Sequence, residues 1–197
     1  MNQQHNKVFV LGYNKTGTKS LSKALTILGF KVMDTNGGGQ LLLDVFDNLK
    51  NNKPILNQYQ EYGAFIDYPI FEPTIFSHIV EEYPNAKYIS LTRNLDDYVE
   101  SVLKDKVKRL QQGIIDSWNW LGVGKQEVFE NYPEYQKNWI KNRTEFKHQS
   151  NLNWLKKKDI NWLDLDICSG DEWNKLCNYL GTEVPNVKFP NINKSRI

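Results

Sequence analysis

Side chains suited to binding an anion are concentrated in one short segment, GYNKTGTKS, at residues 12–20. The donors in it are Lys15, Thr16, Thr18, Lys19 and Ser20. Lysine supplies a full positive charge, and a hydroxyl donates a hydrogen bond to an anionic oxygen. Gly12 and Gly17 let the backbone wrap closely, and successive N–H groups at a helix start attract negative charge. The segment predicts a phosphate- or sulfate-binding loop, rather than a surface loop that only caps a helix.

The elements on either side of this loop would position it at the edge of a sheet. VFVLG at residues 8–12 is a continuous apolar run, as expected of a strand buried on both faces. TKSLSKALTILG at residues 18–29 has apolar residues at helical spacing, and Gly29 is suited to end that helix. A strand therefore leads into the loop and a helix leads out of it.

The loop differs from the nucleoside-triphosphate motif G-x-x-x-x-G-K-[ST] by one position. Gly12 and Gly17 have the spacing of that motif, but Thr18 stands where its lysine belongs. Lys19 comes one residue late and would be turned by about 100° around the helix. This displacement argues against an ATP- and magnesium-dependent small-molecule kinase, which remains an alternative.

A second group of polar residues follows the predicted strand AKYISLT at residues 86–92. Arg93 comes directly after this strand, and Ser101 lies eight residues further, about two turns into the next helix. The two side chains would hold one phosphate from two sides, since the donors of arginine match phosphate oxygens. The alternative for Arg93 is a surface salt bridge with Asp96 or Asp97.

These segments resemble the nucleotide site of the sulfotransferases that use PAPS (3′-phosphoadenosine 5′-phosphosulfate). Residues 15–18, Lys-Thr-Gly-Thr, are similar to the family's 5′-phosphosulfate loop, [RK]-[ST]-G-T. With Ser20 and the helix that follows, they resemble a branch carrying R-T-G-T-x-S-L, whose arginine is replaced here by Lys15. Residues 93–101 resemble the 3′-phosphate site, with Leu95 where proline is usual, and residues 162–195 resemble the end of that branch.

The resemblance implies a role for each candidate residue. The ligands of the 5′-phosphosulfate would be Lys15, Thr16, Gly17, Thr18, Lys19 and Ser20, and those of the 3′-phosphate would be Arg93 and Ser101. Lys15 would also stabilise charge on the oxygen that bridges phosphate and sulfate. Lys194 and Arg196 in the C-terminal tail are further candidates for the 3′-phosphate, against the alternative of a frayed tail.

Asp67 is the candidate general base. It ends the predicted strand GAFID at residues 63–67 and is followed by Tyr68 and Pro69, as in the D-x-P of the related branch. The alternative is that Asp67 caps the next helix or holds a basic side chain. Glu72 is the reserve base; His5, His78 and His148 are poorer candidates.

The predicted function is transfer of a sulfuryl group from PAPS to a hydroxyl or amine acceptor, with release of PAP (3′-phosphoadenosine 5′-phosphate). The acceptor would be a small molecule or a glycan, and residues 111–158 would form a helical region that covers its pocket. No metal is required by this chemistry. A non-catalytic nucleotide-binding protein of the same fold is a second alternative.

Alternation of predicted strands and helices indicates an α/β class, with three α/β/α layers and a mainly parallel central sheet. The resemblance implies the P-loop-like sulfotransferase fold. A length of 197 residues without internal repeats predicts a single domain, with residues 1–6 mobile.

A net charge of +2 argues against nucleic-acid partners and a polybasic membrane patch. Cys168 and Cys177 make no disulfide framework and are expected to be buried or half-buried, and without a signal segment or membrane span the protein is expected in the cytoplasm.

Overall fold

The computed structural model describes residues 7–34, 39–112 and 134–192. It divides into two compact units, one formed by Met1–Arg93 with Lys147–Ile197 and the other by Asn94–Phe146. The first unit contains the sheet and the predicted anion-binding loop.

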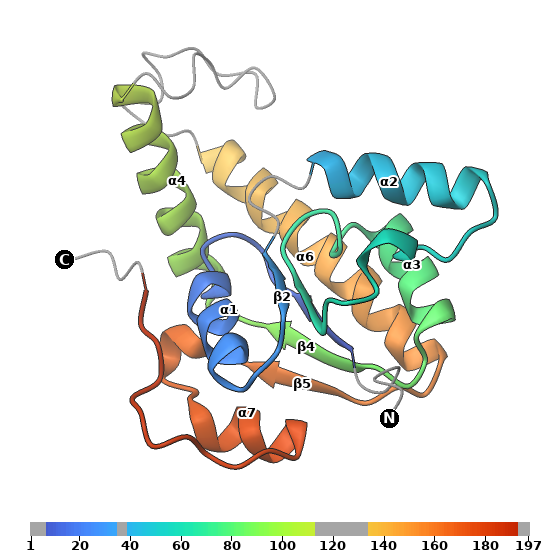
Figure 1. The fold of residues 1–197 in the computed structure, drawn as a ribbon. Coiled ribbons are helices and arrows are strands. Elements are labelled where there is room, and N and C mark those ends of the chain that lie inside the picture. Colours follow the sequence, from blue (N-terminus) through green and yellow to red (C-terminus); the bar gives the residue numbers. More distant parts are fainter. Residues whose placement is uncertain (1–6, 35–38, 113–133, 193–197) are drawn as a thin grey trace. The chain divides into compact units, whose positions relative to one another are not determined.

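The described part of the first unit contains a five-stranded sheet in which every neighbouring pair is parallel (Figure 1). Its strands are β1 (Val8–Leu11), β2 (Val32–Asp34), β3 (Ala64–Ile66), β4 (Lys87–Leu91) and β5 (Trp162–Leu165), in the order β2-β3-β1-β4-β5. β1, β3 and β4 lie within the segments 8–12, 63–67 and 86–92, for which the sequence predicts strands. The predicted α/β class with a parallel central sheet is confirmed.

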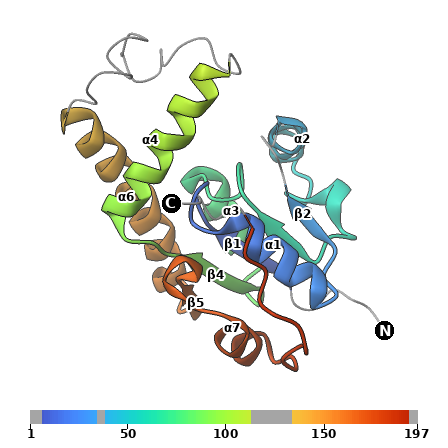
Figure 2. The ribbon, with the colours of Figure 1, turned by 90° about the vertical axis from the view of Figure 1, so that its left-hand side faces the viewer.

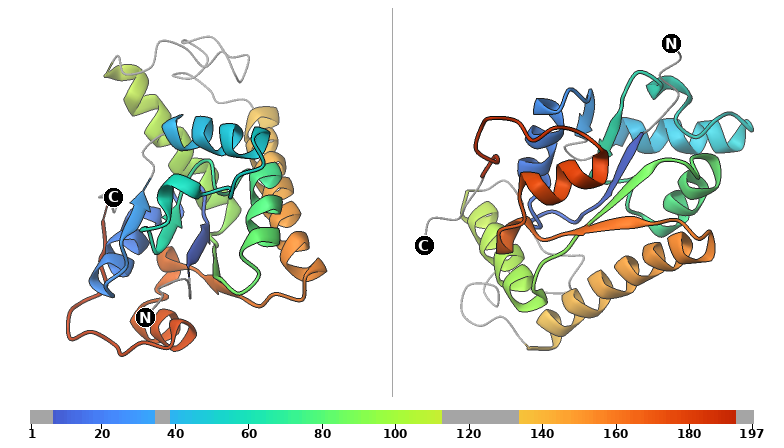
Figure 3. Two further views of the ribbon diagram at one scale, coloured as in Figure 1. Left: turned by 45° about the vertical axis from the view of Figure 1, so that its right-hand side comes forward. Right: turned by 90° about the horizontal axis from the view of Figure 1, so that it is seen from below.

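Helices lie on both faces of this sheet (Figures 2 and 3). α1 (Thr18–Ile27) and α7 (Trp173–Leu180) cover one face; α3 (Pro73–Glu82) and the part of α6 (Glu134–Lys157) from Lys147 onward cover the other. The remaining helices are α2 (Gly39–Lys50), α4 (Leu95–Gln111) and the short 3₁₀ turns η1 (Asn57–Tyr59) and η3 (Ile167–Ser169). The three predicted layers are therefore present in the first unit. Of the helical region predicted at 111–158, α6 is confirmed, and residues 113–133 lie outside the described residues.

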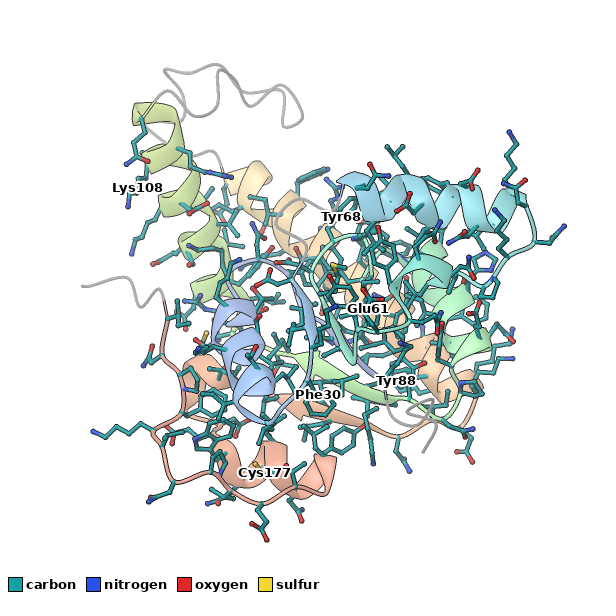
Figure 4. All side chains as sticks on the ribbon, viewed as in Figure 1. Phe30, Glu61, Tyr68, Tyr88, Lys108 and Cys177 are labelled. Atoms are coloured by element: carbon teal, nitrogen blue, oxygen red, sulfur yellow. The ribbon has the colours of Figure 1, made fainter. Side chains whose placement is uncertain are left out.

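Alternating side chains of the strands divide the core into two clusters. Phe9 of β1 stacks on Phe65 at 5.4 Å and on Tyr88 at 5.7 Å, beneath α3 and α6. Val8 and Val10 point to the opposite face and pack in the cluster that includes Cys177 of α7. Figure 4 labels Tyr88 and Cys177 at these two places. Cys177 is buried as expected, but Cys168 is exposed because it lies in the turn η3.

β1 is the central strand. The next two strands, β2 and β3, lie on one side of it, and the last two, β4 and β5, lie on the other. The first crossover runs through α1 to β2, and a later one runs from β3 through α3 across β1 to β4. Ligands of open parallel sheets bind beyond the carboxyl ends of the strands at such a reversal. This edge carries the predicted loop after β1, Asp67 after β3 and Arg93 after β4. None of the described helices is long and apolar enough to span a lipid bilayer.

A half-buried histidine joins α6 to the sheet. His148 Nε2 lies 3.1 Å from the Oγ of Ser90, which is completely buried on β4. Burial lowers the pKa of His148 below its ordinary value of 6.5, and the negative charge of Asp164 opposes this shift. Asp164 is the register partner of Ser90 on β5. The folded protein therefore binds a proton at His148 less readily than the unfolded chain does.

This difference predicts acid sensitivity of the fold. Below the ordinary pKa of 6.5 the unfolded chain takes up a proton that the folded state disfavours, so the free energy of unfolding should fall as the pH falls. In His148→Gln, whose amide is neutral and still able to bond to Ser90, the loss of stability between pH 7.5 and 5.5 should be smaller. Urea unfolding of both proteins at a series of pH values measures it, and parallel pH profiles would contradict the expectation.

Candidate active site

The loop after β1 passes close to β4. A Cβ atom added at Gly12 would lie 2.7 Å from Cδ1 of Leu91, so the side chain of Leu91 would have to shift to admit one. The ring of Tyr13 packs against Phe71 at 4.9 Å. The N–H and the hydroxyl of Thr16 both donate to the carbonyl oxygen of Tyr13, at 3.2 and 2.6 Å. The first half of the loop is thus held by contacts at Gly12, Tyr13 and Thr16.

The second half of the loop presents the uncapped start of α1. Lys15 and Gly17 have left-handed backbone angles, with φ of 74° and 96°. Gly17 is the N-cap of α1, it has no side-chain cap, and the first turn contains no acidic residue. The first helical bond joins the N–H of Leu21 to the oxygen of Gly17. The N–H groups of residues 18–20 precede this bond and lie at the positive end of the helix dipole, where negative charge is attracted.

The predicted 5′-phosphosulfate ligands differ in where their side chains lie. The hydroxyl of Thr16 donates within the loop, and the methyl group of Thr18 is close to Gly12. The hydroxyl of Ser20 accepts a bond from the N–H of Ile192 at 3.0 Å, which attaches the C-terminal tail to α1. The anion-binding roles of these residues stay predictions.

Arg93 connects the end of β4 to the loop. Its Nη1 donates to the carbonyl oxygen of Lys15 at 2.6 Å. Its Nε is buried and has no hydrogen-bond partner among the described residues. Asp96, one of the two salt-bridge alternatives for Arg93, instead pairs with Lys141. A buried donor without a partner is costly, so an anionic ligand at Arg93 would remove this cost.

Ser101, the second predicted ligand of the 3′-phosphate, belongs to the other compact unit. It is a buried residue of α4. Arg93 is the last residue of its own unit, and Asn94 begins the unit of Ser101. In that unit the side chain of Asn94 accepts bonds from the N–H groups of Asp96 and Asp97, which fixes the start of α4. The pairing of Arg93 and Ser101 around one phosphate stays a prediction.

Asp67 follows β3 with a left-handed backbone, φ 78°. Burial raises the pKa of its carboxyl to about 6, and the negative charge of Asp34 adds to the shift. The positive charge of Lys19 and the N–H of Tyr68 partly oppose it. Asp67 does not cap the next helix, because the N-cap of α3 is Glu72. A carboxylate that ionises near neutral pH binds a proton better than an ordinary aspartate, which suits a general base.

The other candidate bases are placed differently. Glu72 forms an ion pair with Lys147 of α6 at 2.5 Å, and both side chains are largely buried. His78 is exposed on α3, and His148 packs against Ser90. His5, like the basic tail residues Lys194 and Arg196, lies outside the described residues.

One residue at this edge was not predicted from the sequence. Asp34, the last residue of β2, lies 3.3 Å from Lys19 Nζ through both of its carboxylate oxygens. Asp34 directly follows the apolar residues Val32 and Met33, which was a usable signal for a strand end, because neighbouring parallel strands end at one edge of the sheet. The described residues contain no group of three or more potential metal ligands.

Comparison with known proteins identifies the family. No curated protein matches the sequence significantly. The model of a sulfotransferase domain matches residues 7–196, which is nearly the whole chain and includes every candidate residue from Lys15 to Ser101. Because this match covers far more than half of the chain, the chain belongs to the sulfotransferase family.

Proposed function

We propose that the protein transfers a sulfuryl group from PAPS to a hydroxyl or amine on a small-molecule or glycan acceptor, and releases PAP. The observation that carries the choice of donor is Arg93. Its guanidinium contacts the anion-binding loop through Lys15, while its buried Nε has no partner in the described part of the chain. A donor with phosphates at both the 5′ and 3′ positions fits a loop and an arginine placed side by side.

Each residue of the site has a chemical task in this proposal. PAPS would supply the sulfuryl group and the PAP leaving group. The N–H groups at the start of α1 and the ammonium of Lys15 bind the 5′-phosphate end and stabilise the negative charge that develops on the bridging oxygen. Arg93 binds the 3′-phosphate, with Ser101 as its proposed partner.

Asp67 accepts the proton of the attacking group. As the acceptor oxygen or nitrogen bonds to sulfur, the bond between sulfur and the bridging oxygen breaks, and its electrons leave with PAP. The acceptor proton passes to Asp67, whose raised pKa of about 6 favours proton uptake while leaving the carboxylate ionised at neutral pH.

The test compares three nucleotides on the wild type and on Arg93→Ala by titration calorimetry. PAP and adenosine 5′-phosphate differ only in the 3′-phosphate, and ADP with magnesium tests the kinase alternative. Loss of a charge-assisted hydrogen bond costs about 1.5–3 kcal/mol, so Arg93→Ala should lower the affinity for PAP by about 10- to 150-fold. Adenosine 5′-phosphate should be affected much less.

The ratio of the two affinities separates two roles of Arg93. If the affinities for PAP and for adenosine 5′-phosphate fall by the same factor in the variant, Arg93 only supports the loop through Lys15, and the 3′-phosphate binds elsewhere. A wild type that prefers ADP with magnesium to PAP would overturn the choice of donor. Arg93→Lys keeps the charge but loses the planar fork, and an intermediate loss is expected for it.

A further inference from the structure

Lys19 and Asp34 form an ion pair at the carboxyl edge of the sheet. The Nζ of Lys19 lies 3.3 Å from both carboxylate oxygens of Asp34. Lys19 is in the first turn of α1 and Asp34 ends β2, so the pair joins the start of the helix to the second strand. The side chains are 37% and 23% exposed, so water screens the charges of this pair in part.

The proposed base lies beside this pair. β2 and β3 are neighbours, with Asp34 opposite Ile66, so Asp67 is only one residue beyond the register partner of Asp34. Asp67 interacts electrostatically with both members of the pair. Among the described residues, the groups that shift the pKa of its carboxyl are the carboxylate of Asp34, the ammonium of Lys19 and the N–H of Tyr68.

The same geometry argues against Lys19 as a ligand of the 5′-phosphosulfate. Lys19 stands one position after the lysine of the nucleoside-triphosphate loop, and its side chain is directed to the end of β2. Moving it to an anion would leave Asp34 unpaired beside a second carboxylate, an arrangement that disfavours ionisation of both. The ion pair therefore opposes such a movement.

We propose that Lys19 is a positioning residue for Asp67, held at the ends of β2 and β3 by Asp34, and that it does not bind the donor phosphate. This inference rests on the proposed role of Asp67 as the base. The negative charge of Asp34 increases the proton affinity of Asp67, and the positive charge of Lys19 keeps Asp67 ionised at neutral pH. The opposite charges of Lys19 on α1 and Asp34 on β2 thus shift the pKa of Asp67 in opposite directions.

The first experiment follows the titration of Asp67 directly, by NMR of its carboxyl carbon in wild type, Asp34→Asn and Lys19→Met. The Asp67→Asn spectrum assigns the signal. Loss of the carboxylate of Asp34 should lower the pKa of Asp67, and loss of the ammonium of Lys19 should raise it. Asp47→Asn, which removes an exposed carboxylate of α2, is the matched control and should leave the titration unchanged. Lys19→Gln and Asp34→Ser are second variants if either of the first fails to fold.

The second experiment asks whether Lys19 touches the nucleotide. PAP affinity of Lys19→Met should stay within about two-fold of that of Lys23→Met, an exposed lysine one turn further along α1, because neither loses a direct charged bond. A loss of about ten-fold or more relative to Lys23→Met would make Lys19 a phosphate ligand and overturn the inference.

Steady-state kinetics link the two experiments to catalysis. The acid limb of the kcat profile should move to lower pH in Asp34→Asn and to higher pH in Lys19→Met, with KM for PAPS little changed in both. Asp34→Glu, which keeps the charge, should restore the wild-type limb at least in part. An acid limb that neither substitution moves would contradict the inference.

The inference and the proposed function fail in different ways. If PAP binds and the pKa of Asp67 is the same in both variants as in the wild type, the inference is wrong and the donor proposal stands. If the titration shifts in opposite directions but the wild type does not bind PAP, the three-residue arrangement stands and the donor proposal is wrong.

Discussion

Replacing Asp67 with asparagine should lower kcat for sulfuryl transfer by about 10²–10⁴-fold, the usual contribution of a general base. Asparagine has nearly the same shape as aspartate but accepts no proton at neutral pH. Because Asp67 is proposed to act on the acceptor, PAP affinity should change little. Calorimetry with PAP and initial rates with PAPS and an acceptor found by screening measure the two effects separately.

The pH profile of the wild type gives a second readout of the same residue. The base must be ionised, and the pKa of Asp67 is raised to about 6, so kcat should fall as the pH drops through that value. An ordinary aspartate would lose its charge only near pH 4. The small residual activity of Asp67→Asn should lack this acid limb, and Asp67→Glu should retain one.

Two results would contradict the role of Asp67. An unchanged kcat in Asp67→Asn would mean that another residue is the base. Glu72 would be the next candidate, and Lys147→Met would release it from its ion pair. A wild type that binds PAP but sulfates no acceptor of any class would favour the non-catalytic alternative. Asp47→Asn serves as the control for removal of one carboxylate.

Replacing Lys15 with methionine should reduce kcat by about 10²–10³-fold, comparable to the loss of one donor that stabilises developing negative charge. Methionine retains most of the length of the side chain and removes the ammonium. PAP should also bind more weakly, because the same ammonium is proposed to contact the 5′-phosphate. Rates with PAPS and calorimetry with PAP measure the two losses.

The backbone of Lys15 provides the control for this prediction. Its φ of 74° is unfavourable for a residue with a side chain and favourable for glycine. Lys15→Gly should therefore keep or increase the free energy of unfolding while losing activity as Lys15→Met does. Lys15→Arg restores the charge and should recover much of the rate. Full activity in Lys15→Gly would exclude an electrostatic role for this side chain.

The amino-acid sequence by itself determined the elements and their class. Strands and helices of this chain carry local patterns, such as the apolar run of β1 and the helical spacing of Leu21 and Leu25 in α1, which depend only on nearby residues. Glycine at positions 12 and 17 likewise indicated a close-wrapping loop, and the structure has a close approach to β4 at the first and a positive φ at the second.

The tertiary structure alone decided what the side chains of the site contact. Lys19 reads as a phosphate ligand from its place in the loop, yet it pairs with Asp34, which is 15 residues away in sequence. Arg93 binds the carbonyl of Lys15, 78 residues away. Such contacts depend on which strands are neighbours and in what register, and the order β2-β3-β1-β4-β5 does not follow the order of the chain. Local patterns carry no information about that order, so the partners of Asp67, Lys19 and Arg93 were visible only once the sheet had assembled them.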